Sequence, residues 1–88
     1  MKEKILKVTP KLGLHAKPAA MFVSEAGKFK CAIKVIKDGT EINGKSVMGL
    51  MLLGAAHGTK LRITADGPDE AAALAALETL FERKFDED

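Results

Sequence analysis

The sequence predicts an α+β fold, an open-faced β-sandwich in which a four-stranded, mainly antiparallel sheet has three helices on one face. Short β-branched runs alternate with segments of helical periodicity in the order βαββαβα. Asp38-Gly39 separates two such runs and is typical of a type I′ hairpin turn. Lysines recur on the polar side of the strands and suit a solvated sheet face. The chain of 88 residues fits a single domain, 1–88.

The first strand and the first helix are expected on either side of Pro10. Residues 4–8 are mostly apolar and form the strand, which ends before the proline because proline cannot donate a ladder hydrogen bond. Pro18 fits only the first turn of a helix, so the helix begins close to His15. Gly27 is expected to end this helix with a positive φ. The inner face of the helix comprises Ala19, Phe22, Val23 and Ala26.

The middle of the chain predicts a hairpin and a short helix. Residues 32–37 and 40–43 form the two strands of the hairpin. Ser46 can cap a helix through its hydroxyl, and the apolar segment 47–53 forms that helix. Leu50 and Leu53 are spaced to face the core.

The last strand and helix complete the pattern. Leu61, Ile63 and Ala65 alternate with polar residues, which is typical of a half-buried strand. A turn at residues 66–68 leads to acidic residues that suit the positive end of the last helix. The inner stripe of this helix and its cationic end comprise Leu74, Leu77, Leu80, Phe81 and Lys84.

Composition and charge narrow the classes of function. The sequence has one cysteine and no apolar leader, and its longest uncharged stretch, 46–59, is too short to span a bilayer. We therefore expect a cytoplasmic protein without a membrane partner. Residues 1–45 contain ten lysines and four acidic residues, whereas residues 46–88 contain four basic and eight acidic residues. The basic half indicates an anionic partner, unless the charges only form a solvated surface.

The segment 13–20 contains the clearest candidate site. His15 stands at the expected helix start and Lys17 follows two residues later. The backbone N–H groups of Ala16 and Lys17 have no intrahelical partner there, and the helix dipole is positive. Such a site binds phosphate or carboxylate, and a neutral imidazole within it is a competent nucleophile for phosphoryl transfer. The alternative is that His15 only caps the helix.

Three segments of this chain resemble the HPr family, the histidine phosphocarriers of the bacterial phosphoenolpyruvate–sugar phosphotransferase system. Residues 13–19 resemble its active-site segment, 43–51 are similar to the motif around its regulatory serine, and 65–70 are similar to its last strand-to-helix turn. The resemblance implies that His15 accepts a phosphoryl group through Nδ1 from enzyme I and passes it to enzyme IIA components of sugar transport. It implies a relay protein rather than an enzyme. Lys17 stands where the family usually has arginine.

The resemblance also implies regulation and docking through the second motif. Ser46 matches the serine that HPr kinase/phosphorylase phosphorylates, although a plain helix cap is the alternative. The family docks its partners on its first two helices, and the apolar residues around Ser46 suit such a surface. The expected docking residues are Ala20, Val47, Met48, Met51 and Leu52.

Other functions are weighed against the phosphoryl relay. A regulatory binding module, an effector or corepressor acting with a transcriptional regulator under control of Ser46, is the main alternative. RNA binding is disfavoured because none of the four phenylalanines lies in an expected strand. His15, His57 and Cys31 lack the spacing of metal ligands. We expect no metal, no cofactor, no nucleic acid and a monomer.

Overall fold

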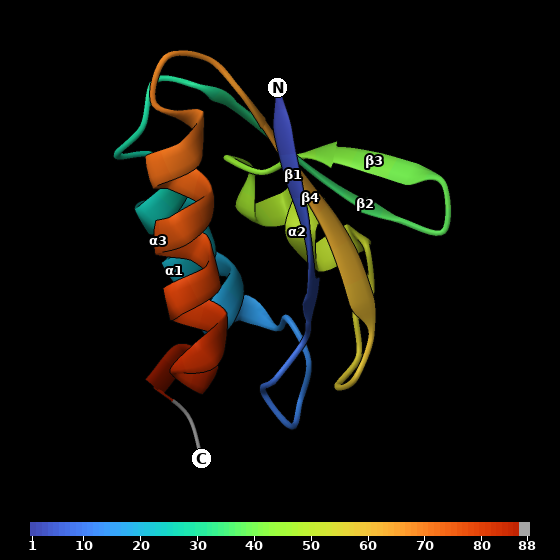
Figure 1. Ribbon diagram of the computed structural model, residues 1–88. Coiled ribbons are helices and arrows are strands. Elements are labelled where there is room, and N and C mark those ends of the chain that lie inside the picture. The colour runs from blue at the N-terminus through green and yellow to red at the C-terminus, as the bar shows by residue number, and fades with distance from the viewer. Residues whose placement is uncertain (87–88) are drawn as a thin grey trace.

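A computed structural model describes residues 1–86, so the last two residues of the expected domain 1–88 lie outside the described residues (Figure 1). One sheet runs in the order β1-β4-β2-β3, and each neighbouring pair is antiparallel. Its strands are β1 (Lys2–Lys7), β2 (Ala32–Lys37), β3 (Thr40–Asn43) and β4 (Lys60–Asp66). The predicted antiparallel sheet is confirmed.

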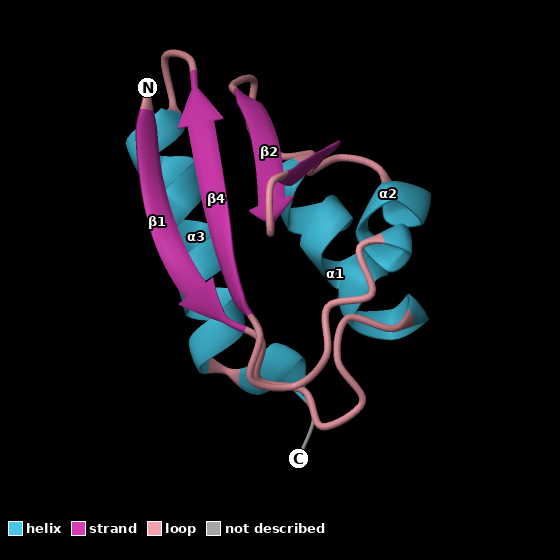
Figure 2. Ribbon diagram, turned by 90° about the vertical axis from the view of Figure 1, so that its right-hand side faces the viewer, coloured by secondary structure: helices cyan, strands magenta, loops and turns pink. Residues whose placement is uncertain are grey.

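The helices lie together on one face of the sheet and leave the other face open (Figure 2). They are α1 (Ala16–Ala26), α2 (Val47–Leu52) and α3 (Glu70–Glu82). The predicted open-faced arrangement with three helices is therefore confirmed. Within residues 1–86, no helix has both the length and the hydropathy of a membrane span.

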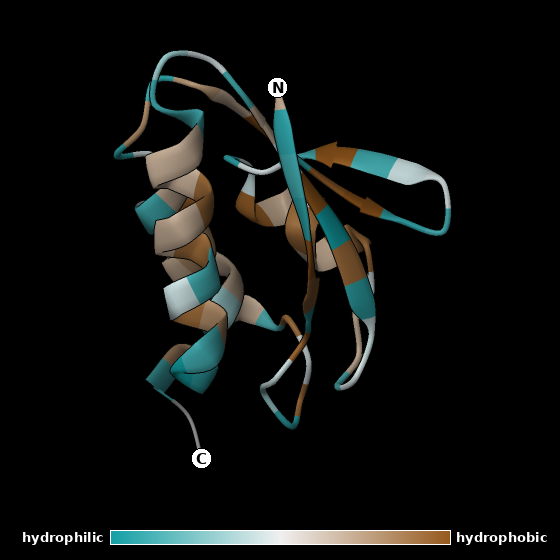
Figure 3. Cartoon of the chain, in the orientation of Figure 1, coloured by the Kyte–Doolittle hydropathy of each residue, from teal (hydrophilic) through white to brown (hydrophobic). Residues whose placement is uncertain are grey.

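The core lies between the sheet and the helices. Apolar and polar residues alternate along β4, with Leu61 and Ile63 fully buried against the helical layer (Figure 3). Phe22 of α1 and Leu77 of α3 are also completely buried. Each such side chain contributes roughly 1.5–3 kcal/mol through burial. Burial of these side chains holds α1 and α3 against the sheet.

Two local predictions are wrong. The first strand covers Lys2–Lys7 rather than 4–8, because pairing with β4 begins at Lys2 and ends at Lys7. Val8 instead forms backbone hydrogen bonds with Thr59 and Gly58, in the turn before β4. Gly27 ends α1 without a positive φ: its φ is −65°, and its N–H donates to the Val23 carbonyl at 2.8 Å. The chain continues there in a right-handed turn, so no left-handed residue is needed.

The hairpin prediction is confirmed in detail. Asp38 and Gly39 have φ of 48° and 82°, and both central positions of a type I′ turn require positive φ. The turn joins β2 to β3 and extends beyond the helical layer (Figure 1).

Candidate functional site

The loop that leads into α1 is tied to the segment after α2. The Leu14 N–H donates to the Ala55 carbonyl at 2.9 Å, and the Leu14 side chain is buried. Gly13 has a φ of +77°, and a Cβ there would lie 2.4 Å from the Ala55 oxygen. Only glycine fits so close to the Ala55 backbone, so the loop is fixed there and holds His15 in a defined position.

His15 occupies the N-cap position of α1. Its backbone is extended, with φ −75° and ψ −170°, and its carbonyl accepts from the Ala19 N–H at 3.0 Å. The half-buried imidazole makes no side-chain capping hydrogen bond to the helix. A capping role therefore does not account for the histidine side chain.

The first turn of α1 offers hydrogen-bond donors to an anion. Within residues 1–86, the backbone N–H groups of Ala16 and Lys17 have no hydrogen-bond partner, and Pro18 has no N–H to leave unsatisfied. Lys17 belongs to the same turn, and its side chain is exposed. Together with the positive end of the helix, these groups can stabilise a phosphoryl group carried by His15.

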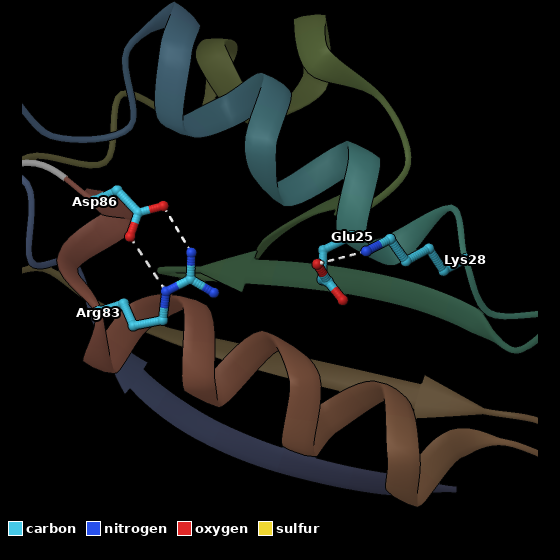
Figure 4. A network of polar contacts seen from close by, with 4 residues as sticks. All are labelled: Glu25, Lys28, Arg83 and Asp86. Carbon is cyan, nitrogen blue, oxygen red and sulfur yellow. Dashed lines mark hydrogen bonds and ion pairs between the residues drawn. The ribbon is translucent and has the colours of Figure 1, made fainter.

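A carboxylate from the far end of the chain lies in the electrostatic environment of Lys17. Asp86 accepts hydrogen bonds from Arg83, at 2.6 Å from Nη2 and 3.2 Å from Nε (Figure 4). These bonds hold the pKa of Asp86 below its usual value, and the charge of Lys17 lowers that pKa further. An acidic group that the sequence did not indicate therefore interacts with the charge of Lys17, although Arg83 and Asp86 themselves stand at a typical ion-pair spacing.

The chain after α3 adopts an unusual backbone that positions this carboxylate. The turn η1 (Lys84–Asp86) has left-handed φ angles of 55°, 54° and 57° at three consecutive residues. Phe85 is completely buried, with its ring centroid 4.9 Å from that of Phe81. Lys84 was expected at the cationic end of the last helix, but α3 ends at Glu82 because burial of Phe85 turns the chain.

Ser46 caps α2 as predicted. The Gly49 N–H donates to the Ser46 Oγ at 3.0 Å, and the Leu50 N–H donates to the Ser46 carbonyl at 3.1 Å. The serine is half-buried at the start of the helix. A phosphate on this Oγ would lie at the positive helix end, which tolerates negative charge.

The expected docking residues lie on α1 and α2, which contact each other. Leu50 and Leu53 are buried, as their spacing predicts, while Met48, Met51 and Leu52 are exposed. We call the expected docking set the helical patch; it comprises Ala20, Val47, Met48, Met51 and Leu52. Met48 and Leu52 are 74% and 81% exposed, Met51 is 46% exposed, Ala20 is exposed, and Val47 is half-buried. Leu12, 80% exposed, is a large apolar residue that the helical periodicity could not reveal, because it lies in a loop.

The remaining candidate residues have structural surroundings. His57 is exposed, and its Nδ1 lies 3.1 Å from the Thr9 carbonyl oxygen and 3.3 Å from that of Pro10. Cys31 is buried, and burial is the main cause that raises the pKa of its thiol. No group of three or more histidine, cysteine or acidic side chains with metal-binding geometry occurs in the described part of the chain.

Known proteins resemble this chain over nearly its whole length. The family described as the PTS HPr component phosphorylation site matches residues 2–83. The phosphocarrier protein HPr of Xylella fastidiosa is 48% identical over 100% of this chain and 99% of its own. The HPr-like protein Crh of Bacillus subtilis is 44% identical over 88% of this chain and 91% of its own.

Solved structures agree with the fold. HPr-C-His from Thermoanaerobacter tengcongensis matches with a TM-score of 0.96 and 46% identity, over 100% of this chain and 99% of that chain. An HPr dimer from the same organism matches with a TM-score of 0.78 and 47% identity, over 97% and 98% of the two chains. With its sequence, fold and candidate site in agreement, the chain belongs to the HPr family of phosphocarrier proteins.

Proposed function

We propose that this phosphocarrier accepts a phosphoryl group on His15 from phosphorylated enzyme I and passes it to enzyme IIA components of sugar transport. The observation that carries the proposal is the position of His15, an imidazole at the N-cap of α1 that does not cap the helix. Two backbone N–H groups and the Lys17 cation lie at the same helix end. This arrangement suits a group that carries negative charge and must also be released.

The transfer needs little chemistry from the protein beyond positioning and charge. The lone pair of Nδ1 forms a bond to phosphorus while the bond between phosphorus and the donor group breaks, and delivery to the acceptor reverses these roles. The N–H groups of Ala16 and Lys17 stabilise the phosphoryl oxygens in both directions. Because a partner enzyme is needed both to load and to unload His15, the chain relays the group and does not catalyse a reaction alone.

Replacing the histidine tests the acceptor directly. His15→Ala should gain no acid-labile phosphate from phosphoenolpyruvate and enzyme I, measured by intact mass. The matched control is His57→Ala, which should be loaded like the native chain because His57 lies in a different loop. Loading of His15→Ala at the native level would contradict the proposal.

Ser46 and the helical patch extend the proposal to regulation and docking. We assign Ser46 as a phosphorylation site of HPr kinase/phosphorylase, and the helical patch as the surface for enzyme I, enzyme IIA components and a transcriptional regulator. The support is the exposed apolar surface next to a helix cap that can carry phosphate. We further propose that the chain acts in the cytoplasm as a monomer. Equilibrium sedimentation tests the monomer, since a relative forms a dimer.

The second candidate is a regulatory module whose main signal is phosphorylated Ser46. The similarity to an HPr-like protein Crh favours it, as does lysine at position 17 in place of arginine. Two parallel reactions separate the candidates: phosphoenolpyruvate with enzyme I and an enzyme IIA component, and ATP with HPr kinase/phosphorylase. Relay to enzyme IIA supports the first candidate. Phosphorylation of Ser46 without relay supports the second.

A further inference from the structure

The open face of the sheet carries an amphipathic hollow on the side away from the helices. Leu6 and Leu61 are buried in the core, so their neighbours along β1 and β4 project to the open face. The hollow has a volume of about 320 Å³. It is lined by Ile5, Ile36, Asp38, Gly39, Lys60 and Arg62. We call it the sheet hollow.

Cations without ion-pair partners surround the sheet hollow. Lys7 of β1 lies directly opposite Lys60 of β4 in the antiparallel register, and like charges in opposite positions destabilise a sheet. In the described residues, neither of these lysines nor Arg62 has an ion pair, whereas two other lysines of the sheet do. Those paired contacts are Lys4 with Glu78 and Lys34 with Glu41. The unpaired cations therefore leave a positive charge that a bound anion would neutralise.

Apolar surface accompanies this charge. Arg62 lies in register between Ile5 of β1 and Ile36 of β2. Ile5 is 64% exposed and Ile36 is half-buried, so both isoleucines offer aliphatic surface beside the guanidinium. Asp38 is the carboxylate among the lining residues. Its negative charge is outnumbered by the charges of Lys60 and Arg62 in the hollow and of Lys7 beside it.

We propose that the sheet hollow binds an acidic segment of a partner protein, with glutamate or aspartate side chains on Lys7, Lys60 and Arg62 and an aliphatic side chain on Ile5 and Ile36. Charge complementarity selects the acidic residues, and the two isoleucines select an aliphatic neighbour. A nucleic acid is the poorer fit because single strands stack their bases on aromatic rings. The phenylalanines of this chain are outside the sheet, at positions 22, 29, 81 and 85.

This surface is separate from the phosphoryl site. The helices cover one face of the sheet (Figure 2), and His15 and the helical patch belong to this helical layer. The sheet hollow is lined by residues of the opposite face. A protein held at the sheet hollow would therefore leave His15 accessible to its donors and acceptors. The carrier could be bound to one protein while it exchanges phosphate with another.

Titration of the isotope-labelled chain with short blocked peptides tests the proposal by NMR. A peptide of alternating glutamate and leucine should bind saturably and shift the backbone amides of Ile5, Ile36 and Arg62. Alternating glutamate and serine should bind more weakly, because the aliphatic contact is lost. No saturable binding, or shifts confined to α1 and α2, would overturn the proposal. Equal or tighter binding of oligothymidylate at the same amides would overturn the choice of a protein partner.

Charge reversal provides the matched comparison. The double variant Lys60→Glu/Arg62→Glu should weaken binding of the glutamate–leucine peptide at least about tenfold, which is ~1.4 kcal/mol. The double variant Lys28→Glu/Lys30→Glu has the same net charge, reverses exposed cations elsewhere, and should bind nearly as the native chain does. Equal weakening in both variants would show that net charge alone attracts the peptide and would refute a defined site.

A stability measurement distinguishes binding from a structural role. If Lys7 and Lys60 repel each other, Lys60→Gln should raise the melting temperature at low salt while it weakens peptide binding. Lys34→Gln is the control, since it removes a lysine paired with Glu41 and should not raise the melting temperature. A lower melting temperature for Lys60→Gln would contradict the unrelieved repulsion on which the proposal rests.

Discussion

Lys17 determines the charge next to the proposed phosphoryl acceptor. Lys17→Glu should slow loading from phosphorylated enzyme I at least about tenfold, equivalent to ~1.4 kcal/mol, because a second carboxylate would stand near Asp86 and the incoming phosphate. Lys17→Arg should keep or increase the rate, since guanidinium binds phosphate in bidentate fashion. Rapid-quench measurements of phosphohistidine formation give both rates.

Folding must be excluded as the cause of any change at position 17. Lys17 is exposed in the first turn of α1, so both variants should unfold in urea close to the native midpoint. A Lys17→Glu variant that is loaded at the native rate would show that the charge of this side chain does not contribute to the site.

Asp69 ties the start of α3 to the segment before β2. Its carboxylate accepts hydrogen bonds from the N–H groups of Lys30 and Cys31 at 2.8 and 2.9 Å. These bonds lower the pKa of Asp69, and the bond from Lys30 is the largest cause. A depressed folded-state pKa adds stability above the unfolded-state pKa, and this stability is lost as pH falls through the folded value. Asp69→Asn should therefore be less stable than the native chain at neutral pH.

The pH profile distinguishes this role from a general loss of packing. The free energy of unfolding of the native chain, measured in urea, should decrease as pH falls below about 4. The same free energy should depend less on pH in Asp69→Asn over this range. Asp66→Asn is the control, because Asp66 is 71% exposed and makes a surface ion pair with the N-terminal ammonium at 3.7 Å. Such an exposed pair contributes little to stability. If the two variants have the same profile, the hydrogen bonds to Asp69 do not account for the acid dependence.

At the scale of an element, substitutions at Ser46, the N-cap of α2, can add charge while they keep the capping hydrogen bond. Ser46→Asp should fold normally because an aspartate also accepts the Gly49 N–H, yet it should slow phosphoryl transfer from enzyme I. An exposed charge interaction of ~0.4–1 kcal/mol corresponds to about 2- to 5-fold slower transfer at low salt. The ratio of mutant to native rate should approach one at about 1 M salt, where the Debye length is about 3 Å.

Ser46→Asn is the matched control, since asparagine caps a helix without adding charge. It should transfer at nearly the native rate at every ionic strength. Slowing of both variants to the same extent would indicate that the serine hydroxyl itself is needed, and a salt-independent ratio for Ser46→Asp would indicate a change in the helix.

The left-handed turn η1 depends on the burial of one aromatic ring. Phe85 is completely buried against Phe81, although its φ of 54° is unfavourable for a large side chain. Phe85→Ala should reduce the free energy of unfolding by about 3–5 kcal/mol, measured by urea denaturation. Phe85→Leu should cost less because it refills much of the volume. A change below about 1 kcal/mol in Phe85→Ala would contradict a core role.

At the scale of the whole molecule, periodicity predicted the elements and their buried faces, but not their neighbours. The alternation of Leu61, Ile63 and Ala65 specifies which side of β4 is inside, and all three are buried. It contains no information on the strand order β1-β4-β2-β3, which depends on contacts between distant segments. The pairing of β2 with β3 is the exception, because the turn residues Asp38 and Gly39 predict it locally.

The candidate site shows the same division. His15, Lys17 and Ser46 are recognisable because each belongs to a short motif at a helix start. The interaction of Asp86 with Lys17 could not be predicted, since the two lie 69 positions apart in the sequence and the chain at Asp86 makes a left-handed turn. Helical patterning also does not predict φ angles after the last apolar residue of a helix.

The segregation of charge along the sequence is partly neutralised in three dimensions. Acidic residues of the second half meet groups of the first half: Glu78 pairs with Lys4, and Glu70 lies 3.3 Å from the N-terminal ammonium. The excess of lysine in the first half is thus not a single basic surface. Within the described residues, the lysines of the first half that have no ion pair include Lys7 on the open face and Lys17 in the first turn of α1.

The pairing of β1 with β4 has a consequence during synthesis on the ribosome. Lys2 pairs with Ala65, and β1 lies at the edge of the sheet with β4 as its sole neighbour. At about 5–20 residues per second, the nascent β1 is translated about 3–12 s before its partner strand. During that interval its backbone donors and acceptors have no native strand to pair with. On a message carrying several ribosomes, the β1 of one nascent chain can therefore meet the completed β4 of its neighbour before its own.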